Sequence, residues 1–174
     1  MNVREYYEHA LAERGYKPDE AQKKAIDRLQ PYYDEWVKSK AMRANALKKL
    51  LTRPDVPRGV YLWGGVGRGK SFLMDAFYAT VPVVRKTRLH FHEFMRGVHR
   101  ELEEVKGMQD PLDEVAKRVA KRYRLICFDE FHVSDVADAM ILHRLLFKLF
   151  EYGTSFVMTS NYEPSTLYPD GLHR

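Results

Sequence analysis

The residues with the clearest chemical purpose form a short glycine-rich segment that lies between an apolar run and a helical pattern. It reads Gly64, Gly65, Val66, Gly67, Arg68, Gly69, Lys70 and Ser71. Its fixed positions match G-x-x-x-x-G-K-[ST], in which glycines let backbone N–H groups approach phosphate oxygens closely. The Lys70 ammonium would meet the β- and γ-phosphates, and the Ser71 hydroxyl would bind Mg²⁺. The pattern predicts a site for ATP and Mg²⁺, and its strand-to-helix context argues against a plain glycine turn.

Two acids, Asp129 and Glu130, end a later apolar run that begins at Leu125. Acids at the carboxyl end of a parallel strand emerge at the crevice where α/β sheets bind ligands. Asp129 would support Mg²⁺ through water, while Glu130 would orient and deprotonate the attacking water. A strand that ends in a solvated acidic turn is the alternative. With the glycine-rich loop upstream, the acids favour hydrolysis of ATP.

Two more polar residues lie near the end of the sequence. Asn161 directly follows the apolar run 155–160, and a neutral amide there could hydrogen-bond the γ-phosphate or the lytic water. A Ser-Asn pair also commonly begins a turn. Arg174 is the last residue, and it could either stabilise the transferring phosphoryl group in a neighbouring subunit or be a terminal arginine without a partner.

The elements that must position these residues alternate between short apolar runs and helical patterns. This alternation predicts an α/β fold with a parallel sheet and helices on both of its faces. The strands are expected at 60–63, 88–92, 124–129 and 155–160, and the helices at 70–79, 94–104, 111–122 and 138–152. Pro111 suits the first turn of its helix, and Asp135 and Asp138 are expected to cap the last one.

An N-terminal helical segment precedes this core. Apolar residues at steps of three and four predict a helix within 19–37, with Pro31 as a break, and the breakers in 52–59 predict a loop. Aromatic residues in this region are expected to be core rather than a partner surface. We therefore divide the chain into an N-terminal helical segment, 1–52, and an ATPase core, 53–174.

The composition of the chain bears on where the protein is located. The chain has 174 residues, of which 45% are hydrophobic and 30% charged, and its net charge is +5. No apolar run approaches the roughly 20 residues of a membrane span, and no signal or transit peptide is evident. The single cysteine, Cys127, lies in an apolar run and is expected to be buried and inert. These features favour a cytoplasmic protein.

Several blocks beyond the nucleotide motifs resemble the ZapE/AFG-type AAA+ ATPases of bacterial cell division and their mitochondrial relatives. The resemblance extends from about Tyr16 to Arg174, and it is carried by the segments 59–75, 90–95, 129–131 and 135–140. It implies a P-loop NTPase (AAA+) core. Family members continue past 171–174 into a fifth core strand and a helical lid, so the resemblance implies that this chain stops before both.

The same resemblance implies a role for each candidate site residue. Lys70 and Ser71 would belong to Walker A, Asp129 and Glu130 to Walker B, Asn161 to sensor 1, and Arg174 would be an arginine finger. Nucleotide-binding residues would extend through Phe72, and Gln22 would contact adenine through its amide. The implied partners are ATP or ADP, other copies of the full-length protein, and the tubulin-like protein FtsZ or another protein client, at the division site.

Four other interpretations stay open at this stage. Asp129-Glu130-Phe131-His132 fits the D-E-x-H pattern of helicases, and a basic AAA+ chain could also be a helicase loader acting with DNA, although the basic residues fit a solvated helix face better. The chain could instead sense a nucleotide without turning it over. His90, His92 and His99 form a weak candidate metal site, and one of these histidines could instead contact Glu130.

Overall fold

The fold is a four-stranded parallel sheet with helices on both faces. The structure is a computed structural model that describes residues 1–15, 20–43, 57, 59–63, 68–133 and 135–160. The sheet order is β1-β4-β3-β2, where β1 is Val60–Trp63, β2 is Lys86–His90, β3 is Leu125–Asp129 and β4 is Ser155–Ser160. All three strand pairs are parallel, as the sequence predicts.

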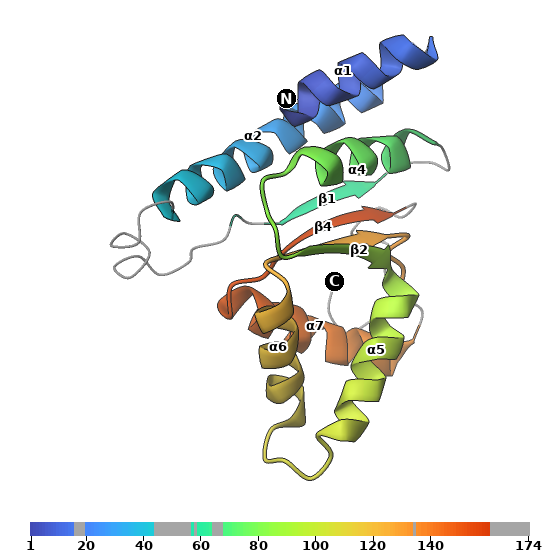
Figure 1. Ribbon diagram of the computed structural model, residues 1–174. Helices are drawn as coiled ribbons and strands as arrows, with labels where there is room; N and C mark the ends of the chain where they lie inside the picture. Colours follow the sequence, from blue (N-terminus) through green and yellow to red (C-terminus); the bar gives the residue numbers. More distant parts are fainter. Residues whose placement is uncertain (16–19, 44–56, 58, 64–67, 134, 161–174) are drawn as a thin grey trace.

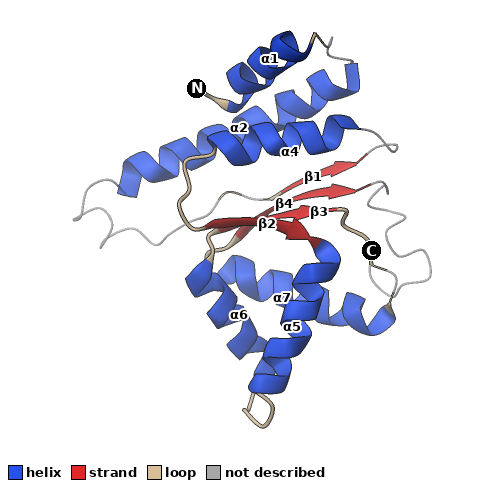
Figure 2. Cartoon of the chain, turned by 45° about the vertical axis from the view of Figure 1, so that its right-hand side comes forward, coloured by secondary structure: helices blue, strands red, loops and turns tan. Residues whose placement is uncertain are grey.

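Two groups of helices enclose the sheet (Figure 1; Figure 2). One face carries α1 (Val3–Arg14), α2 (Glu20–Arg43) and α4 (Arg68–Thr80). The opposite face carries α5 (Phe91–Glu104), α6 (Pro111–Arg122) and α7 (Val136–Glu151). A parallel sheet needs both faces covered, because its connections cross over the faces and its strands are apolar on both sides.

The central strand β3 shows this two-sided burial residue by residue. Leu125 and Cys127 belong to the core on the α2 and α4 side, while Ile126 and Phe128 belong to the core on the α5 to α7 side. The alternation follows from the two-residue period of a strand. Cys127 is buried, as predicted, and this burial raises the pKa of its thiol to about 12.

Local sequence chemistry explains where several helices begin. The side chain of Asp110 accepts a hydrogen bond from the Asp113 backbone N–H, and Pro111 stands in the first turn of α6. At α7 the side chain of Asp135 accepts from the Asp138 N–H. These caps satisfy backbone donors that have no partner within a helix. The predictions for Pro111 and for the α7 cap are confirmed.

Two sequence-based expectations are wrong. Pro31 does not break its helix, since α2 is continuous from Glu20 to Arg43. The proline is exposed, while Leu29, Tyr32 and Tyr33 beside it are buried, so packing on both sides of the proline offsets the lost backbone hydrogen bond.

The second error concerns the strand expected at 88–92, which is β2 at Lys86–His90. Helix α5 begins at Phe91, and Phe91, Phe94 and Val98 are buried at helical spacing. His92 is therefore a helical residue. The two-residue step between His90 and His92 imitates a strand, but burial of the following apolar residues requires a helix.

The N-terminal helices share the core of the sheet. The Tyr32 hydroxyl lies 2.6 Å from Ser155 Oγ on β4, and the Ser155 hydroxyl in turn donates to the Pro57 carbonyl. The Arg124 guanidinium lies 5.3 Å from the ring centre of Trp36. The division of the chain between residues 52 and 53 stays a prediction, and these contacts tie α2 to the core on the other side of that division.

Candidate active site

The carboxyl ends of the four strands meet at one edge of the sheet. Trp63 at the end of β1 pairs with Ser160 at the end of β4, and Asp129 at the end of β3 pairs with His90 at the end of β2. In parallel α/β sheets this edge is where ligands bind. The register therefore brings the last residues of β1, β3 and β4 to the same edge of the sheet.

Lys70 and Ser71 lie in the first turns of α4, which follows β1. Partial burial lowers the pKa of Lys70, because desolvation disfavours the charged ammonium. An anionic phosphate beside this lysine would reverse that effect. The Ser71 side chain is exposed, whereas Gly64, Gly65, Val66 and Gly67 lie outside the described residues.

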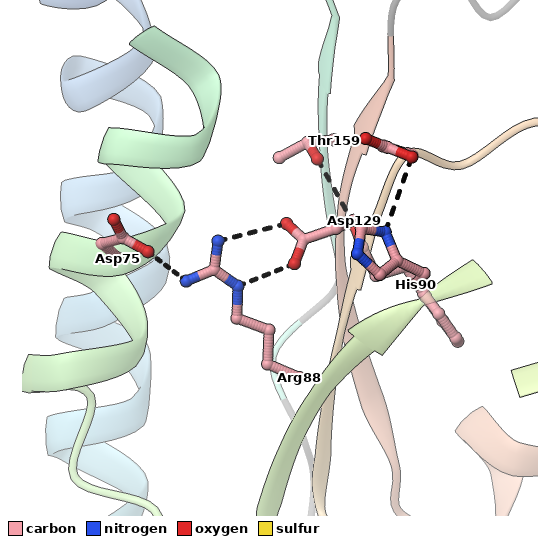
Figure 3. A network of polar contacts seen from close by, with 7 residues as sticks. Asp75, Arg88, His90, Asp129 and Thr159 are labelled. Carbon is pink, nitrogen blue, oxygen red and sulfur yellow. Dashed lines mark hydrogen bonds and ion pairs between the residues drawn. The ribbon is translucent and has the colours of Figure 1, made fainter. Parts of the chain in front are cut away.

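Asp129 is held by an arginine from the neighbouring strand. Arg88 donates from Nε to Asp129 Oδ2 at 2.8 Å and from Nη2 to Oδ1 at 3.3 Å. Its third nitrogen, Nη1, donates to Asp75 on α4. Figure 3 shows the guanidinium of Arg88 lying between the two carboxylates. Arg88 and Asp75 were not among the site residues predicted from the sequence. The one indication that the sequence offered was a charged residue, Arg88, inside an expected strand.

Glu130 occupies an unusual backbone conformation directly after β3. Its φ is 52°, and it is the one non-glycine residue with positive φ in the described part of the chain. The next residue is firmly anchored, since Phe131 N–H donates to the Thr159 carbonyl at 2.8 Å and Phe131 O accepts from Ser160 Oγ at 2.6 Å. The Glu130 side chain is 75% exposed. The carboxylate is therefore accessible at the strand ends.

His90 approaches this carboxylate. Its Nδ1 lies 3.5 Å from Glu130 Oε2, without the geometry of a hydrogen bond. The expectation that one histidine contacts Glu130 is confirmed for His90. The ring of His92 stacks on that of His90 at 5.6 Å, and His99 Nε2 instead contacts Asp138 on α7 at 2.8 Å.

Among the residues that the structure describes, no group of three or more His, Cys, Asp or Glu could hold a metal ion. Magnesium at a phosphate site needs no such group, because substrate oxygens and water supply most of its ligands. A serine hydroxyl at the start of α4 and one carboxylate at the end of β3 fit this kind of coordination.

Asn161 and Arg174 lie outside the described residues. Asn161 directly follows Ser160, the last residue of β4. That strand lies between β1 and β3, so its end lies between the ends of these two strands.

Gln22 lies on α2, where its side-chain oxygen accepts a hydrogen bond from the Tyr7 hydroxyl at 2.7 Å. The Tyr7 ring packs edge-on against the Phe72 ring, with ring centres 5.6 Å apart. The Arg14 guanidinium lies 5.0 Å from the centre of the Phe72 ring. Gln22 is thus connected through Tyr7 to the residue that follows Ser71. The adenine contact itself stays a prediction.

The sheet order and the helix that begins after β1 define a P-loop nucleoside triphosphatase fold of the AAA+ class. The AMPPCP-bound structure of DnaA from Aquifex aeolicus matches with a TM-score of 0.52 at 14% identity, covering 89% of this chain and 43% of that one. The DnaC helicase loader matches with a TM-score of 0.50 at 14% identity, covering 86% and 75%. At these identities the likeness shows a shared fold.

The chain belongs to the AFG1-like ATPase family, whose profile matches residues 1–174. The cell division protein ZapE of Escherichia coli K12 is 45% identical over 179 aligned residues, which cover 97% of this chain and 48% of that protein. The chain thus spans about half the length of this relative. The predicted family and fold class are confirmed. In the described part of the chain, no helix is long and apolar enough to cross a membrane.

Proposed function

We propose that this chain is the part of a ZapE-like ATPase that binds ATP with Mg²⁺ and hydrolyses it. The observation that carries the proposal is the meeting of four strand ends at one edge. Lys70 and Ser71 lie in the first turns of α4, Asp129 ends β3, and Glu130 follows it directly. Water would attack the γ-phosphorus and break the bond to the β-phosphate oxygen, which yields ADP and phosphate.

Each side chain has one task in this reaction. Lys70 neutralises the β- and γ-phosphate oxygens, and the exposed Glu130 carboxylate accepts the proton of the attacking water. Ser71 and Asp129 hold Mg²⁺, which supplies charge stabilisation on the phosphates when it is bound. Asn161 orients the water from the end of β4, Gln22 reads adenine, and Arg174 serves a neighbouring subunit in an oligomer of the full-length protein.

The test compares binding with turnover. We expect Lys70→Ala to weaken ATP affinity by about 100-fold, since it removes a charged contact worth about 3 kcal/mol. We expect Glu130→Gln to retain binding and to lose about 10²- to 10⁴-fold in kcat. Lys38→Ala and Glu103→Gln, at exposed sites on α2 and α5, are the matched controls. Fluorescent-nucleotide titration and phosphate release measure the two quantities.

Equal ATP affinity in wild type and Lys70→Ala would refute the phosphate-loop proposal. Normal binding without turnover in the wild-type chain would instead favour a nucleotide-sensing module. A rate that rises with single-stranded DNA and falls steeply with salt would favour the helicase-loader alternative.

At the cellular level, we place the full-length protein in cell division, in the cytoplasm at the division site. The 45% sequence identity of the chain to the cell division protein ZapE supports this role, and FtsZ is the proposed client. A full-length Glu130→Gln protein held on ATP should retain FtsZ in a pull-down. Absence of FtsZ under conditions where ATP is bound would remove support for this client.

A further inference from the structure

Arg88 connects the helix that carries Lys70 and Ser71 to the strand that carries Asp129. It lies on β2 and pairs with Cys127, two residues before the pairing of His90 with Asp129. Because side chains alternate along a strand, Arg88 and Asp129 project from the same face of the sheet, which is the face covered by α4. From there Arg88 also contacts Asp75 on α4 (Figure 3).

The geometry of the contact with Asp129 is specific to arginine. Two guanidinium nitrogens contact the two carboxylate oxygens, at 2.8 and 3.3 Å, and a third nitrogen remains for Asp75. The planar guanidinium can hold two carboxylates at fixed angles, whereas a lysine ammonium is a single point of charge. The side chains of Arg88 and Asp129 are 22% and 17% exposed. A charge this enclosed requires a partner.

The pKa of Arg88 also indicates that it is the charged partner of both carboxylates. Burial alone would lower the pKa of Arg88, but the hydrogen bonds that it donates to Asp129 and Asp75 outweigh this effect and raise that pKa. The guanidinium therefore stays charged. Each Asp129 oxygen accepts one hydrogen bond from Arg88, and a carboxylate has about four acceptor positions, so about two remain for other donors such as water.

Asp75 gives the bridge its connection to the phosphate-binding helix. It lies four residues after Ser71, so both residues are on one face of α4. The bridge thus connects Asp129 to the helix that carries Ser71, the other residue assigned to Mg²⁺, through contacts that involve neither the metal nor the nucleotide.

We propose that Arg88 is a positioning residue for metal binding, which fixes the Asp129 carboxylate relative to the Ser71 end of α4 by bridging Asp129 and Asp75. The inference rests on the proposed function. Without the bridge, the Asp129 side chain would rotate among its rotamers, and α4 would lose its polar connection to β3. Outer partners of this kind typically contribute 10- to 100-fold to metal affinity.

The experiment measures metal binding without hydrolysis. A fluorescent, non-hydrolysable ATP analogue is titrated with Mg²⁺ on the folded chain, and its affinity is also measured in EDTA. We expect Arg88→Lys to raise the Mg²⁺ concentration for half-maximal effect about tenfold, with unchanged affinity in EDTA. Asp75→Asn should raise it less, because the two contacts between Arg88 and Asp129 remain.

Arg122→Lys is the matched control, since Arg122 pairs with Glu101 at 2.9 Å between α6 and α5, away from the strand ends. It should leave the Mg²⁺ dependence unchanged. An unchanged Mg²⁺ dependence in Arg88→Lys would overturn the inference, and a lower Mg²⁺ requirement would show that Arg88 competes with the metal. Absence of nucleotide binding in the wild-type chain would refute the proposed function itself, which separates the two failures.

Discussion

At the turn after β3, Glu130 has an unfavourable backbone conformation, and its side chain lies near His90 at the strand ends. A φ of 52° at Glu130 costs a non-glycine residue about 1–2 kcal/mol. The cost is offset by Phe131, which is buried and bonded to β4 through Thr159 and Ser160. Strain of this kind persists only where the surroundings enforce it.

This anchoring predicts a specific effect of Ser160→Ala. The substitution leaves the buried Phe131 carbonyl without its 2.6 Å donor and should cost about 1–3 kcal/mol of folding stability. Because the Glu130 turn loosens, kcat should fall severalfold while ATP affinity changes little. The measurement pairs steady-state kinetics with denaturant unfolding.

Ser155→Ala is the control, because it removes a buried hydroxyl from the opposite end of the same strand. It should lower stability without lowering kcat. Equal kcat in the two variants would show that the Ser160 contact only supports the fold.

At the scale of elements, a charged cluster fastens the start of α6 to the end of α7. Asp113 accepts hydrogen bonds from Tyr152 Oη and from Lys148 Nζ, and its other oxygen lies 3.2 Å from Lys117 Nζ. The hydrogen bond from Tyr152, with smaller contributions from the two lysines, lowers the pKa of Asp113 to about 2. The cluster joins two helices whose apolar sides pack under the sheet.

The lowered pKa predicts a pH-dependent contribution to stability. In the unfolded chain an aspartate titrates near 3.9, so the contribution is complete above about pH 4 and is lost as the pH falls towards about 2. Asp113→Asn should therefore lower the free energy of unfolding at neutral pH and reduce its decline between about pH 4 and pH 2. Urea unfolding at a series of pH values measures this change.

Glu103→Gln, an exposed carboxylate on α5, serves as the control and should leave the pH profile unchanged. A profile for Asp113→Asn that runs parallel to wild type would contradict the assignment.

At the scale of the molecule, the N-terminal helices complete the layer above the sheet (Figure 1). Leu29, Tyr32 and Trp36 of α2 belong to the same apolar cluster as Phe77 of α4 and Cys127 of β3. The ring centres of Tyr32 and Phe77 lie 5.5 Å apart. These contacts make α2 part of the unit that positions α4, the helix proposed to bind phosphate.

Trp36→Ala tests whether α2 and the sheet unfold as one cooperative unit. Trp36 is 1% exposed, and its truncation should cost about 3–5 kcal/mol of folding stability. If α2 and the sheet form one cooperative unit, helical signal and nucleotide binding should be lost together at a lower denaturant concentration. The neighbouring Val37→Ala, at a 43% exposed position, should change stability by less than about 0.5 kcal/mol. Two separate transitions would refute the single unit.

Much of the fold was determined by local sequence. The strands at 60–63 and 155–160 were predicted at their observed bounds, and α6 follows from an aspartate cap, a proline and helical spacing. The glycine-rich motif and the pair Asp129 and Glu130 were also recognised from local sequence, because each motif is made of adjacent residues, and their roles stay predictions. Local patterns failed at Pro31 and at the end of β2, where tertiary packing outweighs propensity.

Only the tertiary structure decided which charged residues meet. Arg88 is 41 residues from Asp129 and 13 from Asp75, and nothing in the spacing of these residues indicates that they pair. The sheet order places β2 beside β3, the register aligns Arg88 with Cys127, and α4 covers that face. These long-range relations come from burying apolar surface across the whole chain. The sequence therefore predicted the phosphate and water chemistry, and the fold supplied the arginine that we propose aligns it.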